Sequence, residues 1–357
     1  MPNTFHFKEL LEDLKGKISY RDMTSILKKE ELGSAIGWDK LEERLNGSEP
    51  ALAAKAEQLL KSLQEGLTIA GTKDVYIFEI DSARASSLAD SLAAISVSQG
   101  NYSKAYPRAL SETALKQLTS EHEFVQKITR ANGDVTLVFC AKRAKEERVR
   151  YEISQVGEAV QTAFVGYDEF IAIKRTDYQV FDVLTLRKSL GRIEVLVDHP
   201  DLIRGAETNE LRCLSILGRM TTLIPEMSDI YEQNLPLNLV ACISGLYGDA
   251  NQGRVSKLSF RTPTKSVNRA AVTSHDDLRK EPFHEAGVAK VGEVTPYDIT
   301  IVWDTIVGVQ GSVGVQVSMP IAGLSFEDFH VRQARIIGAQ SDVAVVAVVN
   351  KLVSFST

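Results

Sequence analysis

The sequence predicts an α+β fold, in which a helical N-terminal region is followed by mixed, mainly antiparallel sheet regions and a strand-rich C-terminal part. Three observations favour this class. Apolar residues recur at helical spacing over residues 5–66, β-branched and aromatic runs begin at residue 74, and these runs follow one another without strict strand–helix alternation. Because 357 residues are many for a single core, we divide the chain into regions 1–66, 67–200 and 201–357.

Residues 1–66 are expected to be helical. The clearest helix is SEPALAAKAEQLLKSLQEG, because Pro50 suits a first helical turn and an apolar stripe precedes Gly66. Two shorter helices are expected at 20–27 and 39–45, and their lengths fit a helix-turn-helix. The second of them, WDKLEERL, is net acidic and would be repelled by phosphate, so we interpret the region as a packing or protein-contact module.

Residues 67–200 are expected to form strands around one long helix. The strand DVYIFEI leads into the helix DSARASSLADSLAAI, which Asp81 or Ser82 can cap. Two further strands, DVTLVFCAK and RVRYEI, follow the turn-rich segment ANGD. Three antiparallel strands are expected at 169–175, 179–187 and 192–199, and the short connection KSLG makes the last two a hairpin.

Residues 201–357 are expected to be rich in strands. The segment TNELRCLSILGRMTTLI has a clear helical apolar stripe, and SFEDFHVRQARIIG is also expected to be helical because Ser325 and Asp328 fit a capping pattern. The expected strands are LNLVACISG, GRVSKLSFRT, YDITIVW, GSVGVQVSM and DVAVVAVVNKLVSF. The last of these contains the run Val343 to Val349, which suits a buried strand.

Composition and cysteine usage indicate a cytoplasmic protein. Three cysteines, Cys140, Cys213 and Cys242, are widely spaced and odd in number, which argues against a disulfide framework and against a zinc site. No window reaches the roughly 18 apolar residues of a membrane helix, and the N-terminus lacks the apolar segment of a signal peptide. We therefore expect no membrane partner.

The largest departure from the average composition is a basic stretch between Asp249 and Asp276, which contains no acidic residue although the chain has a net charge of -6. Its cations are Arg254, Lys257, Arg261, Lys265 and Arg269. Because Pro263 and several β-branched residues oppose a continuous helix, we expect a strand that ends in a polar loop. Cations, hydroxyls and backbone N–H groups bind phosphate, so these five residues are predicted to contact DNA or RNA. The alternative is a solvated strand whose cations are paired with acids from elsewhere in the fold.

A second candidate cluster lies in NYSKAYPRALSETALKQL. Tyr102 and Tyr106 alternate there with Lys104 and Arg108, a mixture that single-strand grooves use for base stacking and charge. The alternative is that the tyrosines pack a loop, while the cations of AKRAKEERVR solubilise a hairpin.

No catalytic motif is present, and we predict no cofactor. The chain has no GxxxxGK[ST] phosphate loop and no GxSxG nucleophile elbow. The acids and histidines that could hold a divalent metal ion are His275, Asp276, Asp277 and His284, but no metalloprotease spacing accompanies them. The favoured alternative is that Ser274 or His275 caps a helical turn, with Asp276 and Asp277 at its positive end.

The sequence thus predicts a non-enzymatic subunit of a cytoplasmic assembly that binds nucleic acid or protein. In general texture, an α+β chain without catalytic motifs, it resembles bacterial accessory proteins, including those of phage-defence loci. One alternative is a metal-dependent nuclease or phosphodiesterase. Another is a structural homo-oligomer in which Val343 to Phe355 pairs as a strand between subunits.

Overall fold

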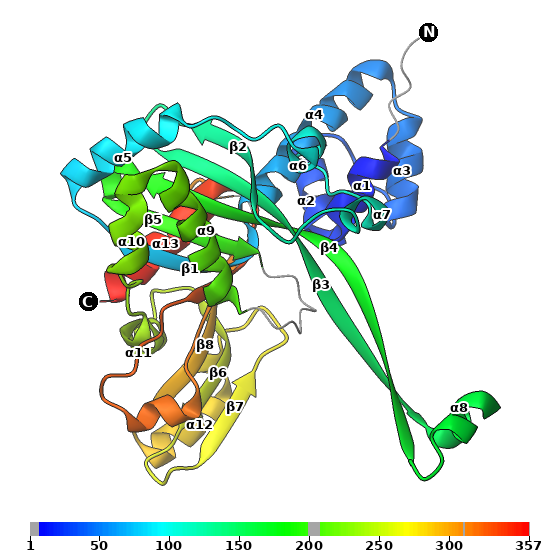
Figure 1. The fold of residues 1–357 in the computed structure, drawn as a ribbon. Coiled ribbons are helices and arrows are strands. Elements are labelled where there is room, and N and C mark those ends of the chain that lie inside the picture. Colours follow the sequence, from blue (N-terminus) through cyan, green and yellow to red (C-terminus); the bar gives the residue numbers. More distant parts are fainter. Residues whose placement is uncertain (1–6, 199–207, 310, 357) are drawn as a thin grey trace.

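The structure is a computed structural model that describes residues 7–198, 208–309 and 311–356 (Figure 1). The helices are α1 (Lys8–Lys15), α2 (Tyr20–Lys29), α3 (Trp38–Asn46), α4 (Pro50–Ile69), α5 (Ser82–Ala94), α6 (Asn101–Ala105), α7 (Glu112–Leu115), α8 (Glu158–Ala163), α9 (Asn209–Leu223), α10 (Ser228–Glu232), α11 (Val240–Gly248), α12 (Pro282–Val291) and α13 (Asp342–Phe355). The strands are β1 (Gly71–Glu79), β2 (Glu123–Thr129), β3 (Val135–Glu152), β4 (Glu169–Arg187), β5 (Arg192–Asp198), β6 (Arg254–Arg261), β7 (Val267–Ala271), β8 (Thr295–Trp303), β9 (Val313–Ser318) and β10 (Ala334–Ala339). The predicted α+β class is confirmed.

Helices α1 to α4 pack around an apolar core of their own. Helix α2 begins at Tyr20 because the Ser19 side chain accepts a hydrogen bond from the Asp22 backbone N–H. Its buried residues Met23, Ile26 and Leu27 recur at helical spacing, and they share this core with the buried residues of α4. The helices predicted in the N-terminal region are therefore confirmed.

One antiparallel sheet of ten strands joins the rest of the described chain. Its order is β2-β3-β4-β5-β1-β10-β9-β8-β6-β7, so the early strand β1 lies between β5 and the late strand β10. Because β10 pairs with β1, the predicted regions 67–200 and 201–357 share one sheet. The predicted boundary between them, at 200/201, lies outside the described residues.

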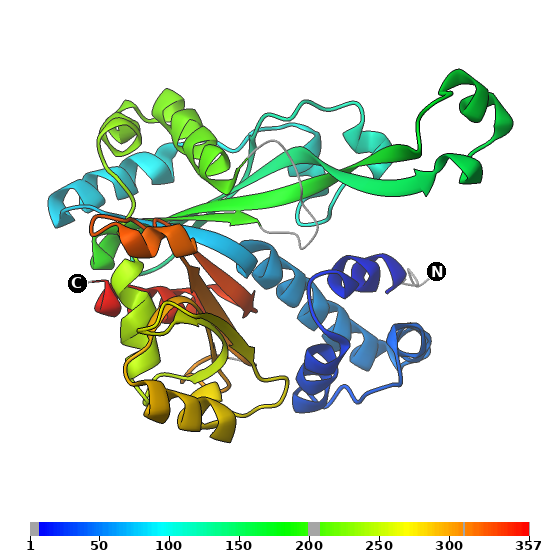
Figure 2. The same cartoon turned by 90° about the horizontal axis from the view of Figure 1, so that it is seen from below.

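Helices cover the sheet on two sides (Figures 1 and 2). Helices α5, α9 and α10 pack on one face of β1, β3, β4 and β5. Helices α11 and α13 pack on the opposite face, against β6, β8, β9 and β10. Side chains alternate between the two faces along a strand. Ser259, Asp298 and Ser318 therefore lie on the face of β6, β8 and β9 that points away from the core shared with α11 and α13, and the strand register makes them neighbours.

Strands β3 and β4 extend beyond the sheet as a two-stranded arm, and α8 lies at its tip (Figures 1 and 2). The pairing runs without a break from Val135 opposite Leu186 to Glu152 opposite Glu169. The strands predicted separately as DVTLVFCAK and RVRYEI are therefore one strand, β3. Those predicted at 169–175 and 179–187 are likewise one strand, β4. The predicted β4–β5 hairpin is confirmed, with Gly191 in the left-handed conformation at φ 59°.

Two predicted strands are helices. The segment LNLVACISG forms much of α11, and the segment predicted as a C-terminal strand forms α13. Ser341 caps α13 by accepting from the Ala344 N–H, and buried Val345, Val348 and Leu352 fall on one helical face. Because α13 packs inside the chain, the predicted pairing of Val343 to Phe355 as a strand between subunits is wrong.

The helix predicted for SFEDFHVRQARIIG is also wrong. A short 3₁₀ turn ends at Ser325, residues 326–333 contain no helix, and β10 begins at Ala334. The capping residues had no amphipathic face behind them, whereas Ala334 and Ile336 alternate inward from β10.

Among the described residues, no helix is long and apolar enough to cross a membrane.

Candidate functional site

The predicted basic stretch forms the β6–β7 hairpin at one edge of the sheet. Its turn closes through a hydrogen bond from the Thr262 N–H to the Ser266 carbonyl, 2.9 Å long. Lys265 occupies the left-handed region at φ 65°, which few residues other than glycine adopt. The hairpin therefore carries Arg254, Lys257 and Arg261 on β6, Lys265 in the turn and Arg269 on β7.

Acidic neighbours neutralise one of these five cations. The Arg254 guanidinium pairs with Asp304 at 2.8 Å. Within the described ranges, Lys257, Arg261, Lys265 and Arg269 form no ion pair. Lys257, Lys265 and Arg269 are exposed, and Arg261 is half-buried. Four predicted phosphate contacts are thus accessible, whereas Arg254 is engaged by a carboxylate.

Strand register places three of these cations on one face. Arg269 lies opposite Ser259, Lys257 opposite Ala271 and Arg261 opposite Val267. The intervening residues Leu258 and Phe260 point into the core, so the cations point away from it. A hollow of about 450 Å³ adjoins this face and is lined by Arg269, Ser259, Asp298 and Ser318 among others. Asp298 accepts hydrogen bonds there from Ser259 at 3.3 Å and from Gln316 at 2.9 Å.

The second predicted cluster is not assembled as a base-stacking surface. Tyr102 is 3% exposed and lies in the core, where burial raises its pKa to about 12. Tyr106 packs its ring edgewise against Phe181, with 6.4 Å between ring centroids. Arg108 pairs with Glu9 at 2.6 Å, and Lys104 is exposed. Tyr102 is buried and Tyr106 is half-buried against Phe181, so both tyrosines contribute to packing.

The cations of the arm differ from those of the β6–β7 hairpin, because many of them have carboxylate partners. Glu146 pairs with Arg148 at 3.0 Å and with Arg175 at 2.9 Å. Arg150 pairs with Glu169 at 3.3 Å, and Lys142 lies 3.9 Å from Asp177. Cations with carboxylate partners, in the arm, can therefore be compared with the four described cations of the β6–β7 hairpin that have none.

The candidate metal ligands do not converge. Asp277 binds Arg279 at 2.7 Å and caps the turn that follows, and His284 is bound to the Tyr247 hydroxyl at 3.0 Å. Asp276 accepts from Ser274, and His275 lies beside Arg21. Among the described residues, no three acids, cysteines or histidines are grouped as metal ligands.

A hydrogen-bonded series of Asp182, His122 and Ser215, in which the aspartate and histidine are buried and the serine is exposed, was not predicted from the sequence. His122 Nε2 lies 2.8 Å from Asp182, and its Nδ1 lies 3.2 Å from Ser215. Although these residue types serve in acyl hydrolases, Ser215 lies inside α9, where helical bonding uses the backbone N–H groups that an oxyanion hole needs. Arg212 of the same helix also binds Asp182, so these side-chain contacts hold α9 against β4.

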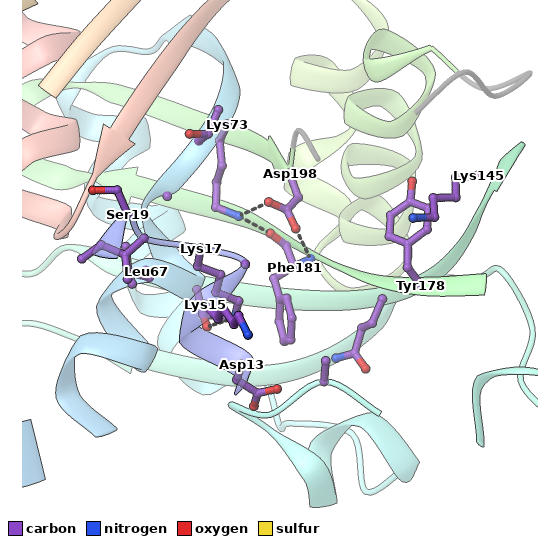
Figure 3. Close-up of a pocket in the computed structure, with 17 residues that line it drawn as sticks. Asp13, Lys15, Lys17, Ser19, Leu67, Lys73, Lys145, Tyr178, Phe181 and Asp198 are labelled. Atoms are coloured by element: carbon purple, nitrogen blue, oxygen red, sulfur yellow. Dashed lines mark hydrogen bonds and ion pairs between the residues drawn. The ribbon is translucent and has the colours of Figure 1, made fainter. Parts of the chain in front are cut away.

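A cavity of about 740 Å³ at the base of the arm was missed as well (Figure 3). Four lysines line it, and they come from distant parts of the sequence: Lys15, Lys17, Lys73 and Lys145. The nearest sequence signal is the Lys73–Asp74 pair at the head of an apolar strand. No local motif could have brought these lysines together.

No protein-family model matches the chain, and no curated protein matches it significantly.

Proposed function

We propose that this protein binds DNA or RNA as a non-enzymatic subunit of a cytoplasmic assembly, through Lys257, Arg261, Lys265 and Arg269 of the β6–β7 hairpin. The observation that carries the proposal is the absence of any ion pair for these four side chains within the described residues, although the chain is acidic overall. A phosphate backbone would supply the missing counter-charge. The role in phage defence stays a prediction, because no contact in the structure bears on it.

The contrast with the arm supports this assignment. Basic residues at an edge strand also discourage strands of other molecules from pairing with that edge. The arm also carries many cations, but its sequence contains as many acids, and Glu146, Glu169 and Asp177 pair with four of those cations. Of the four unpaired cations, Arg269 lies on the edge strand β7 itself. Four accessible cations, three of them on one sheet face, favour a polyanionic partner.

The test is fluorescence anisotropy with single- and double-stranded DNA and RNA, at salt concentrations from about 50 mM to about 200 mM. The variant replaces Lys257, Arg261, Lys265 and Arg269 with alanine. Its matched control replaces four ion-paired arm cations with alanine: Lys142, Arg148, Arg150 and Arg175. Both variants lose four positive charges.

We expect a weaker salt dependence of binding for the hairpin variant. If each cation holds one phosphate, the slope of log K against log salt should be smaller in magnitude by about 3.6. The arm control should keep most of its affinity. Equal weakening of both variants, or no binding by the unmodified protein, would overturn the proposal. Sedimentation of the hairpin variant separates the two roles of the cations, because loss of edge protection would appear as self-association.

A further inference from the structure

The cavity at the base of the arm lies where β4 leaves the sheet. Its walls come from the α1–α2 connection, the end of α4, the start of β1, and the β3 and β4 strands (Figure 3). Its volume of about 740 Å³ is in the range of small-molecule sites in proteins. Phe181, Leu67 and Ile18 supply apolar wall, and lysines supply charge.

One lysine and one aspartate of the cavity neutralise each other. The Lys73 side chain is 1% exposed and donates to the Phe181 carbonyl and, at 3.2 Å, to the Asp198 carboxylate. The other oxygen of Asp198 accepts the Phe181 backbone N–H at 3.1 Å. Asp198 thus accepts from β1 and β4, and among the described residues no carboxylate lies at ion-pair distance from Lys15, Lys17 or Lys145.

Lys17 is the residue that points most directly to a ligand. Its ammonium donates to the Thr68 hydroxyl at 3.2 Å and lies 4.7 Å from the centroid of the Phe181 ring. An ammonium has three N–H donors, and within the described chain no carboxylate lies at ion-pair distance from this one. Burial lowers the pKa of Lys17; Asp198 opposes that shift, and Lys73 adds to it. An anionic oxygen in the cavity would satisfy the remaining donors.

The cavity as a whole carries surplus positive charge. Among the described residues, its ionisable lining consists of four lysines and two aspartates, Asp13 and Asp198, together with Tyr178. Burial raises the pKa of Asp13, which accepts from Gln64 at 2.7 Å. The buried Tyr178 hydroxyl has no partner among the described residues and provides one more donor. Two surplus positive charges match a phosphate monoester, which carries about −1.5 to −2 near neutral pH.

We propose that this cavity binds a phosphate monoester of the nucleoside monophosphate class, with Lys17 and Lys15 on the phosphate and the apolar wall beside the nucleoside. A phosphate alone would leave most of the volume empty, and the wall of Phe181 and Leu67 suits an organic group. The ligand could be a free nucleotide or the 5′-phosphorylated end of a nucleic acid, since both present the same chemistry. This inference does not depend on the β6–β7 hairpin.

Isothermal titration calorimetry of the full chain with AMP and adenosine tests the inference. We expect binding of AMP and much weaker binding of adenosine. Lys17→Met keeps the aliphatic stem and should weaken AMP binding about tenfold or more, and exposed Lys15→Met should weaken it less. Lys40→Met is the matched control, because Lys40 lies on the surface of α3 and pairs with Glu43.

Oligonucleotides with and without a 5′-phosphate distinguish the two sources of the ligand. Preference for the phosphorylated end over AMP would identify a nucleic-acid terminus, and the reverse would identify a free nucleotide. Equal affinity for AMP and adenosine with no preference for a 5′-phosphate, or undiminished binding by folded Lys17→Met, would overturn the inference. The quadruple alanine variant of the β6–β7 hairpin should bind AMP normally, so failure of one proposal leaves the other standing.

Discussion

Asp182 keeps a negative charge in the middle of the sheet, where its side chain is fully buried. It contacts Arg212 at 2.5 Å, His122 at 2.8 Å and the Asp198 backbone N–H at 2.7 Å. Burial alone would raise the pKa of Asp182, but Arg212 and His122 outweigh burial and hold that pKa well below its ordinary value. Such a carboxylate couples the stability of the fold to pH.

Asp182→Asn should destabilise the protein by about 3–5 kcal/mol at neutral pH, because it leaves Arg212 buried beside a neutral group. The folded state binds the Asp182 proton less readily than the unfolded chain. The stabilisation is therefore complete above the unfolded pKa of about 4, and it decreases as pH falls through that value toward the folded pKa. Urea denaturation between about pH 3 and pH 7 measures both effects.

Asp229→Asn is the control for this change. Asp229 is an exposed partner of Arg84, at 3.3 Å, so its loss should cost less than about 1 kcal/mol. If Asp182→Asn left the acid branch of the stability curve unchanged, the Asp182 carboxylate would not be ionised in the folded protein.

At the residue scale, the sequence shows where the charged residues lie but not which of them form ion pairs. The five cations of the basic stretch were found because no acid lies near them in sequence, but Asp304, the partner of Arg254, lies 50 residues away. Burial of Tyr102 depends on neighbours from β2 and β3 and could not be deduced from its own loop. The lysines of the cavity meet only after α1, β1 and β3 have assembled.

Helix α13 shows why apolar runs mislead at the scale of one element. The run Val343 to Val349 is β-branched and suits a buried strand, and propensity alone favours that interpretation. The Ser341 cap and the apolar positions 344, 345, 348, 349 and 352 also fit a helix. Tertiary packing against α11 and β10 decides between them, so the local sequence was insufficient.

Leu352→Ala should destabilise the protein by about 2–5 kcal/mol, because Leu352 is fully buried in the core between α13 and the sheet. Val343→Ala on the same helix is the control, since Val343 is 54% exposed and its truncation should cost less than about 1 kcal/mol. Thermal unfolding followed by circular dichroism compares them. Equal losses of stability from the two substitutions would contradict the packing of α13.

At the scale of the whole molecule, the two tryptophans lie in different apolar cores and can report on them separately. Trp38 lies in the helical N-terminal module and packs against Tyr20, with 5.3 Å between ring centroids. Trp303 is 5% exposed in the core of the sheet. The fold class could be predicted because helical and strand-like segments are segregated in the sequence. The strand order could not, because the pairing of β1 with β10 leaves no local signal.

Urea unfolding of the single-tryptophan variants Trp38→Phe and Trp303→Phe should give different midpoints. We expect the variant that retains Trp38 to report unfolding at lower urea, because α1 to α4 bury a smaller core than the sheet does. Fluorescence follows each tryptophan, and circular dichroism follows both regions. Coincident midpoints in all three measurements would instead mean that the helices and the sheet unfold as one cooperative unit.

The position of β10 has a consequence for biosynthesis. Strand β1 is complete early in translation, but its neighbour β10 is the last strand of the sheet to leave the ribosome. Until then a central, apolar strand presents unsatisfied backbone groups along one side, which is a template for misassembly with other nascent chains. We therefore expect newly made protein to need a chaperone until residue 339 has emerged.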